Sequence, residues 1–404
     1  MNILQIAPQI PYPLLDGGKV GIFNITRHLA QRGHQITLLA FDREEHYDPG
    51  PLPQFCEVIP VKHSTRNSLL GGFMNLFSGA PYNIAKYRSR MLEVMLKSLL
   101  TSRSFDVVHV DHLHMAHYGL MCKEMANLPI VLREHNIEST IVERFIETGS
   151  SLMLRVYLKE QVWRIRRYEA AMAAHYDACC VITEDDRKRL EELQPSVKAR
   201  VVTGGVEAGY FAERPGNDVI PHSISFFGGL DWIPNQDAIH WFHDYIFPRI
   251  KEKYSDAKMY LIGKRPAHSI KALEGENVII RGFVPDLLSE IRRYQVTVAP
   301  FRIGGGIRLK ILESFAMRIP VVATTVGCEG ILARHNEHLL IANTPEDFAG
   351  SVIRLFEDKA LKERLTQHAF ALAHERYRWE HVAEEFENVY IEAIQRKRRT
   401  GDKP

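Results

Sequence analysis

The chain has 404 residues, a length that favours two domains over a single hydrophobic core. Its 51 lysines and arginines nearly balance its 49 aspartates and glutamates, so net charge excludes a general preference for nucleic acid. The apolar fraction, 45%, is that of a globular protein, and no apolar run is long enough to span a bilayer. The opening residues MNILQIAP have the pattern of a core strand and not of a signal peptide, which predicts a cytoplasmic protein.

Neither the cysteines nor the histidines predict a metal site. The five cysteines show no C-x-x-C spacing and two of them are adjacent, which favours reduced core residues over disulfides. Three histidines fall within residues 109–114, but an extended chain would divide their side chains between two faces. We therefore expect no metal and no bound cofactor.

Short apolar runs alternate with helical stretches, which is the pattern of a parallel α/β sheet. Ile3–Ala7 predicts the first strand, and the loop after it ends in Gly17 and Gly18 immediately before a helix. This opening lacks the G-x-G-x-x-G fingerprint, which argues against an NAD-dependent dehydrogenase. The glycine pair suits the close approach of a ligand, although an ordinary turn explains it equally well.

Two later strands of this half, near 107–110 and 130–132, run into polar segments. The side chains expected there are Asp111, His112, His114, His135 and Glu138. Ligands of open parallel sheets bind beyond the carboxyl ends of the strands, and histidine can transfer protons or bind sugars near neutral pH. A ligand site is therefore expected at these strand ends, with satisfied surface histidines as the alternative.

Two stretches raise the question of a membrane surface. Residues 68–77 are unusually apolar within a helical region expected over 68–100, and Arg155–Ala174 predicts a strongly basic helix. Core packing and a solvated helix face are the ordinary explanations. Peripheral contact with an anionic bilayer is the alternative interpretation.

Linker composition near Thr203–Gly205 and 214–218 marks a domain boundary. We expect an N-terminal domain at 1–206 and a C-terminal domain at 207–377. The break in helical periodicity at 377–382 suggests that a final helix, at about 378–397, leaves the second domain and packs back on the first.

In the second half, glycines follow three predicted strands, which end at Phe227, Ala299 and Thr324. After the second of them come Gly304–Gly306 and then a helix that begins near Arg308. A helix that opens from a glycine loop points unpaired N–H groups and a positive dipole end at the space in front of it, which suits a phosphate. Repeated glycines at strand ends favour a nucleotide site over ordinary turns.

Several segments resemble the family-4 glycosyltransferases of the GT-B fold. They are APFRIGGGIRLKILESFAMRIPVVATTVG and FFGGLDWIPNQDAIHWF, supported by PYPLLDGG, FDVVHVD and YRWEHVAEEFENVY. The resemblance implies two Rossmann-like α/β/α domains facing each other across a cleft, with the C-terminal helix crossing back to the N-terminal domain. It also implies a UDP- or GDP-sugar in the C-terminal domain, an acceptor in the N-terminal domain, and transfer with retention and without a metal.

The resemblance assigns individual residues. Glu313 matches the ribose-binding second glutamate of an E-x7-E motif, whereas the first glutamate is replaced by Gly305, so backbone amides of the loop or another side chain would contact the donor sugar. The expected donor-binding residues are Gly17, Gly18, Gly228, Gly229, Asn235, Arg281, Phe283, Gly304, Gly305, Gly306, Arg308, Lys310 and Glu313. The expected catalytic residues are Asp111, His112, Arg308 and Lys310. The acceptor side is assigned to His114, His135 and Glu138.

The expected chemistry is electrostatic: the cations and loop amides stabilise the charge that grows on the departing diphosphate. No pair of nucleophilic carboxylates is visible, which disfavours glycoside hydrolysis. The expected acceptor is a glycan or a lipid-linked sugar of the cell envelope or of an exopolysaccharide, at the inner face of the membrane. A sugar-nucleotide epimerase on the same fold and a non-catalytic nucleotide-binding protein are the alternatives.

Overall fold

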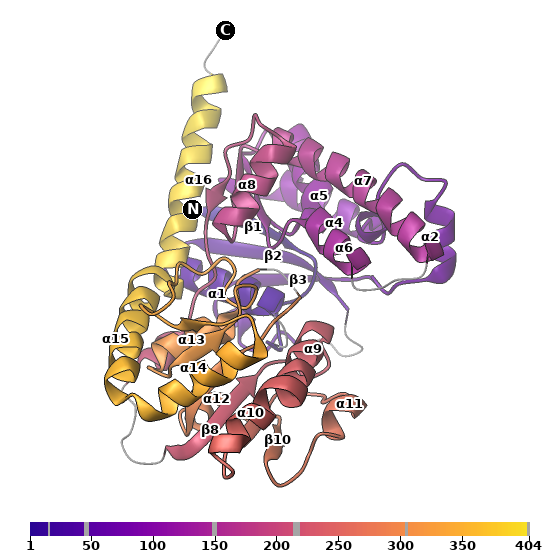
Figure 1. The fold of residues 1–404 in the computed structure, drawn as a ribbon. Helices are drawn as coiled ribbons and strands as arrows, with labels where there is room; N and C mark the ends of the chain where they lie inside the picture. Colours follow the sequence, from indigo (N-terminus) through magenta and orange to yellow (C-terminus); the bar gives the residue numbers. More distant parts are fainter. Residues whose placement is uncertain (15–16, 44–47, 148–151, 213–218, 304–305, 402–404) are drawn as a thin grey trace. The chain divides into compact units, whose positions relative to one another are not determined.

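The computed structural model describes residues 1–404 except 15–16, 44–47, 148–151, 213–218, 304–305 and 402–404 (Figure 1). The chain divides into two compact units. Unit 1 comprises Met1–Thr203 and Glu380–Pro404, and unit 2 comprises Gly204–Trp379. The divisions therefore fall within three residues of the positions expected from the sequence.

Unit 1 is built on a parallel sheet in the order β3-β2-β1-β4-β5-β6-β7 among the described residues. Its strands are β1 (Asn2–Ala7), β2 (Gln35–Asp42), β3 (Glu57–Lys62), β4 (Val107–Asp111), β5 (Ile130–Glu134), β6 (Ala178–Val181) and β7 (Arg200–Val201). Ile3 pairs with Ile36 on one side and with Val107 on the other, so the strand order reverses between β1 and β4. Ligands of such sheets bind at the carboxyl edge near this reversal.

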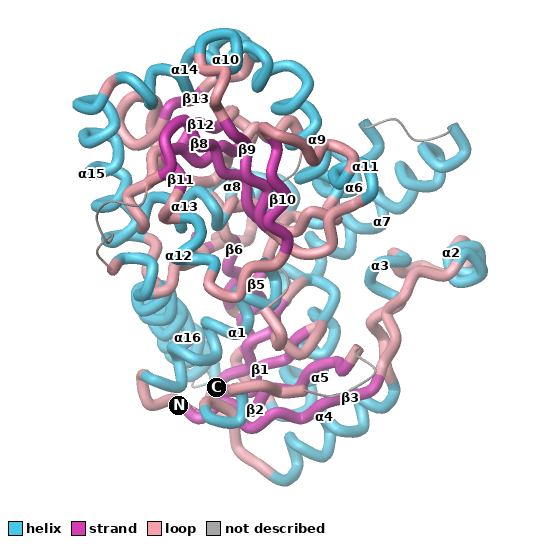
Figure 2. The backbone as a smooth tube through the Cα atoms, turned by 90° about the horizontal axis from the view of Figure 1, so that it is seen from below, coloured by secondary structure: helices cyan, strands magenta, loops and turns pink. Residues whose placement is uncertain are grey.

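The helices of unit 1 lie on both sides of this sheet (Figure 2). They are α1 (Gly17–Gln31), α2 (Leu69–Asn75), α3 (Tyr82–Ala85), α4 (Arg90–Ser102), α5 (Ala116–Ala126), α6 (Glu138–Glu147), α7 (Leu152–His175), α8 (Glu184–Leu193) and α16 (Trp379–Gly401), with short 3-10 turns at Leu52–Gln54 and Leu113–Met115. The single helical region expected over 68–100 is wrong, because the chain there forms α2, α3 and α4. Pro81 begins α3, and the Ser89 side chain accepts a hydrogen bond from the Leu92 amide to begin α4.

The final helix, α16, completes the core of unit 1. The Tyr390 hydroxyl lies 2.5 Å from Nδ1 of His109, in the middle of β4, and both side chains are buried. Phe386 packs edge-on against the same imidazole. At the surface, Arg32 pairs with Glu387. The return of the last helix to the first unit, expected from the sequence, is what the structure has.

Unit 2 has a second parallel sheet, in the order β10-β9-β8-β11-β12-β13 among the described strands. The strands are β8 (Ile220–Phe227), β9 (Lys258–Ile262), β10 (Val278–Gly282), β11 (Tyr294–Ala299), β12 (Val321–Ala323) and β13 (Leu340–Ile341). Its reversal lies between β8 and β11. The helical segments are Ala208–Phe211 (3-10), α9 (Ile233–Trp241), Phe242–Ile246 (π), α10 (Phe247–Lys253), α11 (His268–Lys271), α12 (Leu287–Ile291), α13 (Leu309–Ala316), α14 (Pro345–Glu357) and α15 (Lys359–Arg376).

Both faces of this second sheet are covered, as expected for a parallel sheet. Phe226 belongs to the large apolar cluster that includes residues of α9, α10 and α14, whereas its neighbour Phe227 packs in a smaller cluster with Ile291 of α12. Alternating side chains of one buried strand thus reach opposite faces, because the side-chain period of a strand is two. Loops follow the carboxyl ends of the strands, and these loops form the site described next.

A glycine contact at the end of β9 gives a test of this packing. A Cβ atom at Gly263 would lie 1.7 Å from the Gly228 carbonyl oxygen, whereas a Cβ at Gly275 would have no atom within 4 Å. We expect Gly263→Ala to destabilise unit 2 by about 2 kcal/mol or more, since the backbone must shift to admit the methyl group. Gly275→Ala is the matched control, and equal thermal midpoints for the two variants would contradict the close approach.

Candidate functional site

The carboxyl ends of β8, β9 and β10 are joined by backbone hydrogen bonds. The Gly228 amide donates to the Ile262 carbonyl at 2.9 Å, and the Gly263 amide donates to the Gly282 carbonyl at 2.8 Å. Gly228 has a φ of 140°, in the region that favours glycine. These glycines hold two turns so close together that no side chain fits between them, which leaves backbone exposed at the strand ends.

Lys310, on the first turn of α13, lies directly beneath the Gly228 turn. A Cβ atom at Gly228 would be 3.2 Å from the Lys310 Nζ. The ammonium donates a hydrogen bond to Asn235 Oδ1 at 3.2 Å and lies 3.8 Å from the ring centroid of Phe226. Asn235 in turn donates to the Gly229 carbonyl at 2.7 Å, so it joins the cation to the turn. Three residues that the sequence assigned to the donor site (Gly228, Asn235 and Lys310) are therefore brought together.

The charge on Lys310 is poorly compensated. The side chain is buried, and within the described parts of the chain no carboxylate lies at ion-pair distance from its nitrogen. Burial, and after it the positive charge of Arg308, holds the pKa of Lys310 well below its usual range, while Glu313 opposes the shift. A buried cation with this environment is suited to an anionic ligand.

Arg308 is the residue immediately before α13. Its side chain is buried, its Nη1 donates to the Gly306 carbonyl at 3.0 Å, and its guanidinium lies over the ring of Phe301 at 4.8 Å. Gly306 has a φ of 74°, which permits the tight turn into the helix. The other two glycines of this loop, Gly304 and Gly305, lie outside the described residues.

Glu313 lies one turn further along α13 and is half-buried. Burial raises the pKa of its carboxyl to about 7, against the opposing effects of Lys310 and of a hydrogen bond with Tyr210. Tyr210 was missed by the sequence analysis, because no motif marks it and it lies about a hundred residues away in the 3-10 turn Ala208–Phe211. A carboxyl group with one tyrosine partner retains oxygen lone pairs for hydroxyl groups of a ligand.

Arg281 and Phe283, the two residues expected beside the base of the nucleotide, have different surroundings. Arg281 donates from its Nε to Glu290 Oε1 at 2.7 Å, so its guanidinium is held by a carboxylate of the same unit. Phe283 is exposed, and the ammonium of Lys264 lies 4.2 Å from its ring centroid. The aromatic face of Phe283 is therefore accessible at the edge of the site, whereas Arg281 has a structural partner. Lys264 was another residue that the sequence gave no reason to single out.

In unit 1, Asp111 is fully buried at the end of β4. One carboxylate oxygen accepts from Arg133 Nη1 at 2.9 Å, and the other accepts from Gln5 Nε2 at 2.8 Å. Burial by itself raises the pKa of Asp111, but His109 and Arg133 overcome this effect and hold it well below its usual value. With both oxygens engaged inside the unit, Asp111 has no surface to offer a substrate. This burial speaks against the catalytic role expected for it and favours a structural one.

Arg133 also packs closely against the backbone of α1. A Cβ atom at Gly21 would lie 2.8 Å from Arg133 Nη2, so the guanidinium and the helix backbone are in close contact. Gly17 and Gly18 begin this helix, and a Cβ at Gly17 would meet no atom within 4 Å. Gly17 thus has open space around it, whereas a side chain at Gly21 would displace Arg133.

The histidine-rich strand ends of unit 1 lie close together, as expected. The rings of His112 and His135 stack at a centroid distance of 5.1 Å, and His114 Nε2 lies 3.7 Å from Glu138 Oε2. His112 has a φ of 69°, and its amide donates to the Arg133 carbonyl at 2.8 Å. Burial raises the pKa of Glu138 to about 7 and lowers that of His114 to about 3. Burial also holds the pKa of His135 well below its usual value, so at neutral pH the imidazoles of His114 and His135 can accept or donate hydrogen bonds without a full charge.

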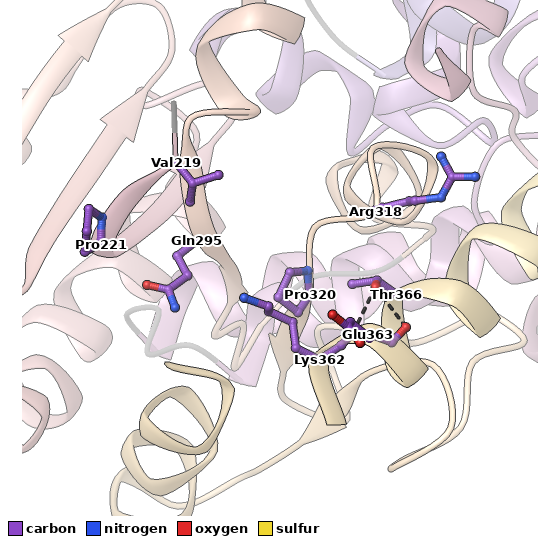
Figure 3. A pocket seen from close by; sticks show the side chains of 8 residues that line it. All are labelled: Val219, Pro221, Gln295, Arg318, Pro320, Lys362, Glu363 and Thr366. Atoms are coloured by element: carbon purple, nitrogen blue, oxygen red, sulfur yellow. Dashed lines mark hydrogen bonds between the residues drawn. The ribbon is translucent and has the colours of Figure 1, made fainter. Parts of the chain in front are cut away.

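In the described parts of the chain, no group of three or more His, Cys, Asp or Glu side chains is arranged to hold a metal ion. A hollow of about 280 Å³ lies at the amino ends of β8, β11 and β12, lined by Gln295, Lys362 and their neighbours (Figure 3). It is at the opposite edge of the sheet from Lys310 and does not belong to this site.

The buried cation leads to a test in which stability and binding change in opposite directions. Replacing Lys310 by Met keeps the aliphatic bulk and removes a desolvated charge. We expect Lys310→Met to raise the thermal midpoint of the ligand-free protein and to weaken nucleoside diphosphate binding roughly ten- to hundredfold. Calorimetric titration with UDP and GDP and a thermal melt measure both effects. Unchanged affinity for both nucleotides in a folded variant would contradict this role of Lys310.

Comparisons with known proteins agree with this architecture. Residues 15–209 match the model of glycosyltransferase family 4, and residues 221–358 match that of the glycosyl transferases group 1. An uncharacterized 44.6 kDa protein in the cps region of Klebsiella pneumoniae is 21% identical, over 93% of this chain and 96% of that protein.

Two solved structures share the fold. Sucrose-phosphate synthase from Thermosynechococcus elongatus has a TM-score of 0.73 at 14% identity and covers 98% of this chain and 100% of its own. HepE from Anabaena, in complex with UDP and glucose, has a TM-score of 0.66 at 14% identity, with coverages of 96% and 99%. Together with the two matching family models, which span both units, these likenesses show that the chain belongs to the family-4, group 1 glycosyltransferases of the GT-B fold.

Proposed function

We propose that this glycosyltransferase moves a sugar from a UDP- or GDP-sugar to a hydroxyl group of a glycan or lipid-linked acceptor, with retention and without a metal. The observation that carries the proposal is the buried Lys310 ammonium beneath the Gly228 turn, with Arg308 beside it. A diphosphate would supply negative charge beside the Lys310 ammonium and the Arg308 guanidinium. HepE, a protein with the same fold, binds UDP and glucose, which supports a nucleotide sugar as the donor class.

The proposed chemistry is the heterolysis of the bond between the anomeric carbon and the diphosphate oxygen. The electron pair stays on the diphosphate, the acceptor oxygen bonds to the anomeric carbon, and the hydroxyl proton leaves with the released diphosphate. Lys310, Arg308 and the amino end of α13 are in place before the charge develops, so they stabilise it with little reorganisation. Preorganised donors of this kind typically contribute a factor of roughly 10²–10³ in rate each.

The ribose and the base would lie further along the same edge. Glu313, with lone pairs left by its single tyrosine partner, is placed to accept from the ribose hydroxyls. The exposed ring of Phe283 offers a surface on which a base can stack. The acceptor would bind in unit 1 near His114, His135 and Glu138, in a pathway that builds an envelope or exopolysaccharide glycan.

Glu313 provides the test of the donor assignment. We expect Glu313→Ala to weaken UDP or GDP binding roughly tenfold or more, since a hydrogen bond to a carboxylate is lost. Because the pKa of Glu313 is raised to about 7, binding of the nucleotide sugar should strengthen as pH rises through 7 and the carboxylate forms. Glu313→Gln should remove this pH dependence, and titration calorimetry between pH 6 and pH 8 measures it.

The activity itself is tested by following free nucleoside diphosphate and the sugar product together. Transfer releases the diphosphate, an epimerase returns it still bound to the sugar, and a non-catalytic protein binds without turnover. If the folded Glu313→Ala and Glu313→Gln variants bind UDP and GDP with the affinity of the unchanged protein, the donor site is contradicted.

We also propose that unit 1 contacts the cytoplasmic surface of a membrane. Within the described residues, no helix combines the length and apolar character needed to cross a bilayer. Several of the exposed large apolar side chains of the described residues lie on α2, α6 and α7. Phe77 is 81% exposed and Met153 is 87% exposed. The exposed apolar residues of α2, α6 and α7 and of the turn after α2 are Phe73, Met74, Leu76, Phe77, Ile141, Phe145, Met153, Leu154, Val156 and Trp163.

Contacts join α2 and α7 into a continuous surface. Arg164 Nη1 donates to the Asn75 carbonyl at 2.9 Å, and α6 packs along α7 (Figure 1). Residues 62–102 carry six lysines and arginines against one acid, in a chain whose overall charge is nearly balanced. Exposed apolar side chains in a segment rich in lysine and arginine fit the interface of an anionic bilayer better than bulk water.

A double substitution, Phe77→Asp with Met153→Asp, should lower partition onto phosphatidylglycerol-containing vesicles about tenfold or more, because two large side chains no longer enter the interface. Met125→Asp is the control. It lies on α5, where Lys123 contacts His175 at the far end of α7 from Met153. Co-sedimentation with these vesicles and with pure phosphatidylcholine measures the effect. Equal partition of all three proteins would refute the membrane surface.

A further inference from the structure

Five polar residues from four separate segments converge at the carboxyl edge of the unit 1 sheet. Arg43 follows β2, Lys86 and Tyr87 follow α3, His114 follows β4, and Glu138 begins α6. The Lys86 Nζ lies 5.7 Å from the ring centroid of Tyr87, the ring centroids of Tyr87 and His114 are 4.6 Å apart, and His114 Nε2 is 3.7 Å from Glu138. Arg43 also hydrogen-bonds with Tyr87. We refer to these five residues as the unit 1 edge cluster.

Within the described part of the chain, the two cations of the cluster have amide partners. Lys86 Nζ donates to Asn67 Oδ1 at 2.9 Å, and Arg43 Nη1 donates to Gln9 Oε1 at 3.3 Å. Among the residues that the structure describes, neither cation has a carboxylate within 4.0 Å. Lys86 is partly buried and lies near the positive charge of the exposed Arg43, so an added anion would stabilise the Lys86 ammonium.

The electrostatic effects within the cluster agree with this excess of positive charge. Burial lowers the pKa of Lys86, the charge of Arg43 lowers it further, and Glu138 opposes both. Burial raises the pKa of Glu138 to about 7, so this carboxyl is only partly ionised at neutral pH and does not balance both cations. Among the described residues of the cluster, positive charge therefore exceeds negative charge near neutral pH.

The backbone around Lys86 is held firmly. Its carbonyl oxygen is 2.9 Å from His63 Nε2, and the ring of His63 packs on Phe41 of β2 at 4.6 Å. The next carbonyl, that of Tyr87, accepts from the Tyr118 hydroxyl at 2.9 Å. Lys86 thus extends from a backbone fixed on both sides, as expected of a preorganised binding site and not of a solvated surface lysine.

We propose that Arg43 and Lys86 bind an anionic group of the acceptor, a carboxylate or a phosphate, while His114 and Glu138 hydrogen-bond neighbouring hydroxyl groups. The inference deepens the proposed function, because it rests on unit 1 holding the acceptor. It narrows the acceptor to an acidic sugar or a phosphorylated one. Both chemistries place negative oxygens where the two cations converge, so the experiment has to separate them.

The test uses three sugars that differ only at carbon 6: methyl β-D-glucoside, its 6-phosphate and methyl β-D-glucuronide. Binding to the full chain is measured by saturation-transfer NMR without nucleotide. We expect at least one anionic sugar to bind about tenfold or more tightly than the neutral glucoside, and the preferred anion identifies the acceptor class. Lys86→Met and Arg43→Gln should each abolish this preference and leave the weak binding of the neutral sugar unchanged.

Lys97→Met, on the exposed face of α4, is the matched control and should keep the preference. Equal binding of the three sugars, or full preference retained in folded Lys86→Met and Arg43→Gln, would overturn the proposal. UDP is the fourth probe: if Lys86→Met weakens UDP binding as Glu313→Ala does, the cation serves the donor and the acceptor assignment is wrong. Since the sugar titrations need neither donor nor turnover, loss of UDP binding through Glu313 would refute the proposed function and leave this result standing.

Discussion

The candidate donor site depends on one constraint: among the described residues, the buried Lys310 ammonium has no acidic partner within ion-pair distance. Lys310 is held by an amide oxygen and by aromatic ring faces, which are weak substitutes for the water it has lost. Such an arrangement persists because the surrounding sheet is well packed and because a ligand can supply the missing charge. Gly228 serves the same end, since a side chain there would lie against the Lys310 ammonium, and Gly263 lets the Gly228 backbone approach closely. The buried charge of Lys310 therefore lowers the stability of the ligand-free protein and raises its affinity for an anion.

The two units use one topology in different ways. Both sheets reverse their strand order after the first strand, β1 in unit 1 and β8 in unit 2. In unit 2 the carboxyl edge at the reversal bears glycines and the buried cation Lys310. In unit 1 the corresponding position is filled by Asp111, whose oxygens are taken by Arg133 and Gln5. In unit 1 the polar groups that a ligand could reach lie on the segments that carry Lys86 and Glu138, and not at the end of β4.

The sequence predicted the layers and the grouping of residues around α13 better than the contacts inside unit 1, for a physical reason. Apolar periodicity and glycine spacing are local signals, and they marked the parallel sheets and the turn into α13. The grouping of Gly228, Asn235 and Lys310 followed from family motifs at similar spacing. Asp111 illustrates the limit: its position after a strand suggested a ligand site, but its partners Gln5 and Arg133 are not visible as neighbours along the chain. Tyr210, Arg43 and Lys86 were missed because tertiary contacts alone give them their surroundings.

The helix α16 has a consequence for how the molecule is made. Its Tyr390 fills the space beside His109 at the centre of β4, so the core of unit 1 stays incomplete during synthesis until α16 has emerged from the ribosome. All strands and helices of unit 2 precede α16 in the chain, so unit 2 does not depend on this helix for its core. The folding of the first strands is thus coupled to a helix that is made more than two hundred residues later.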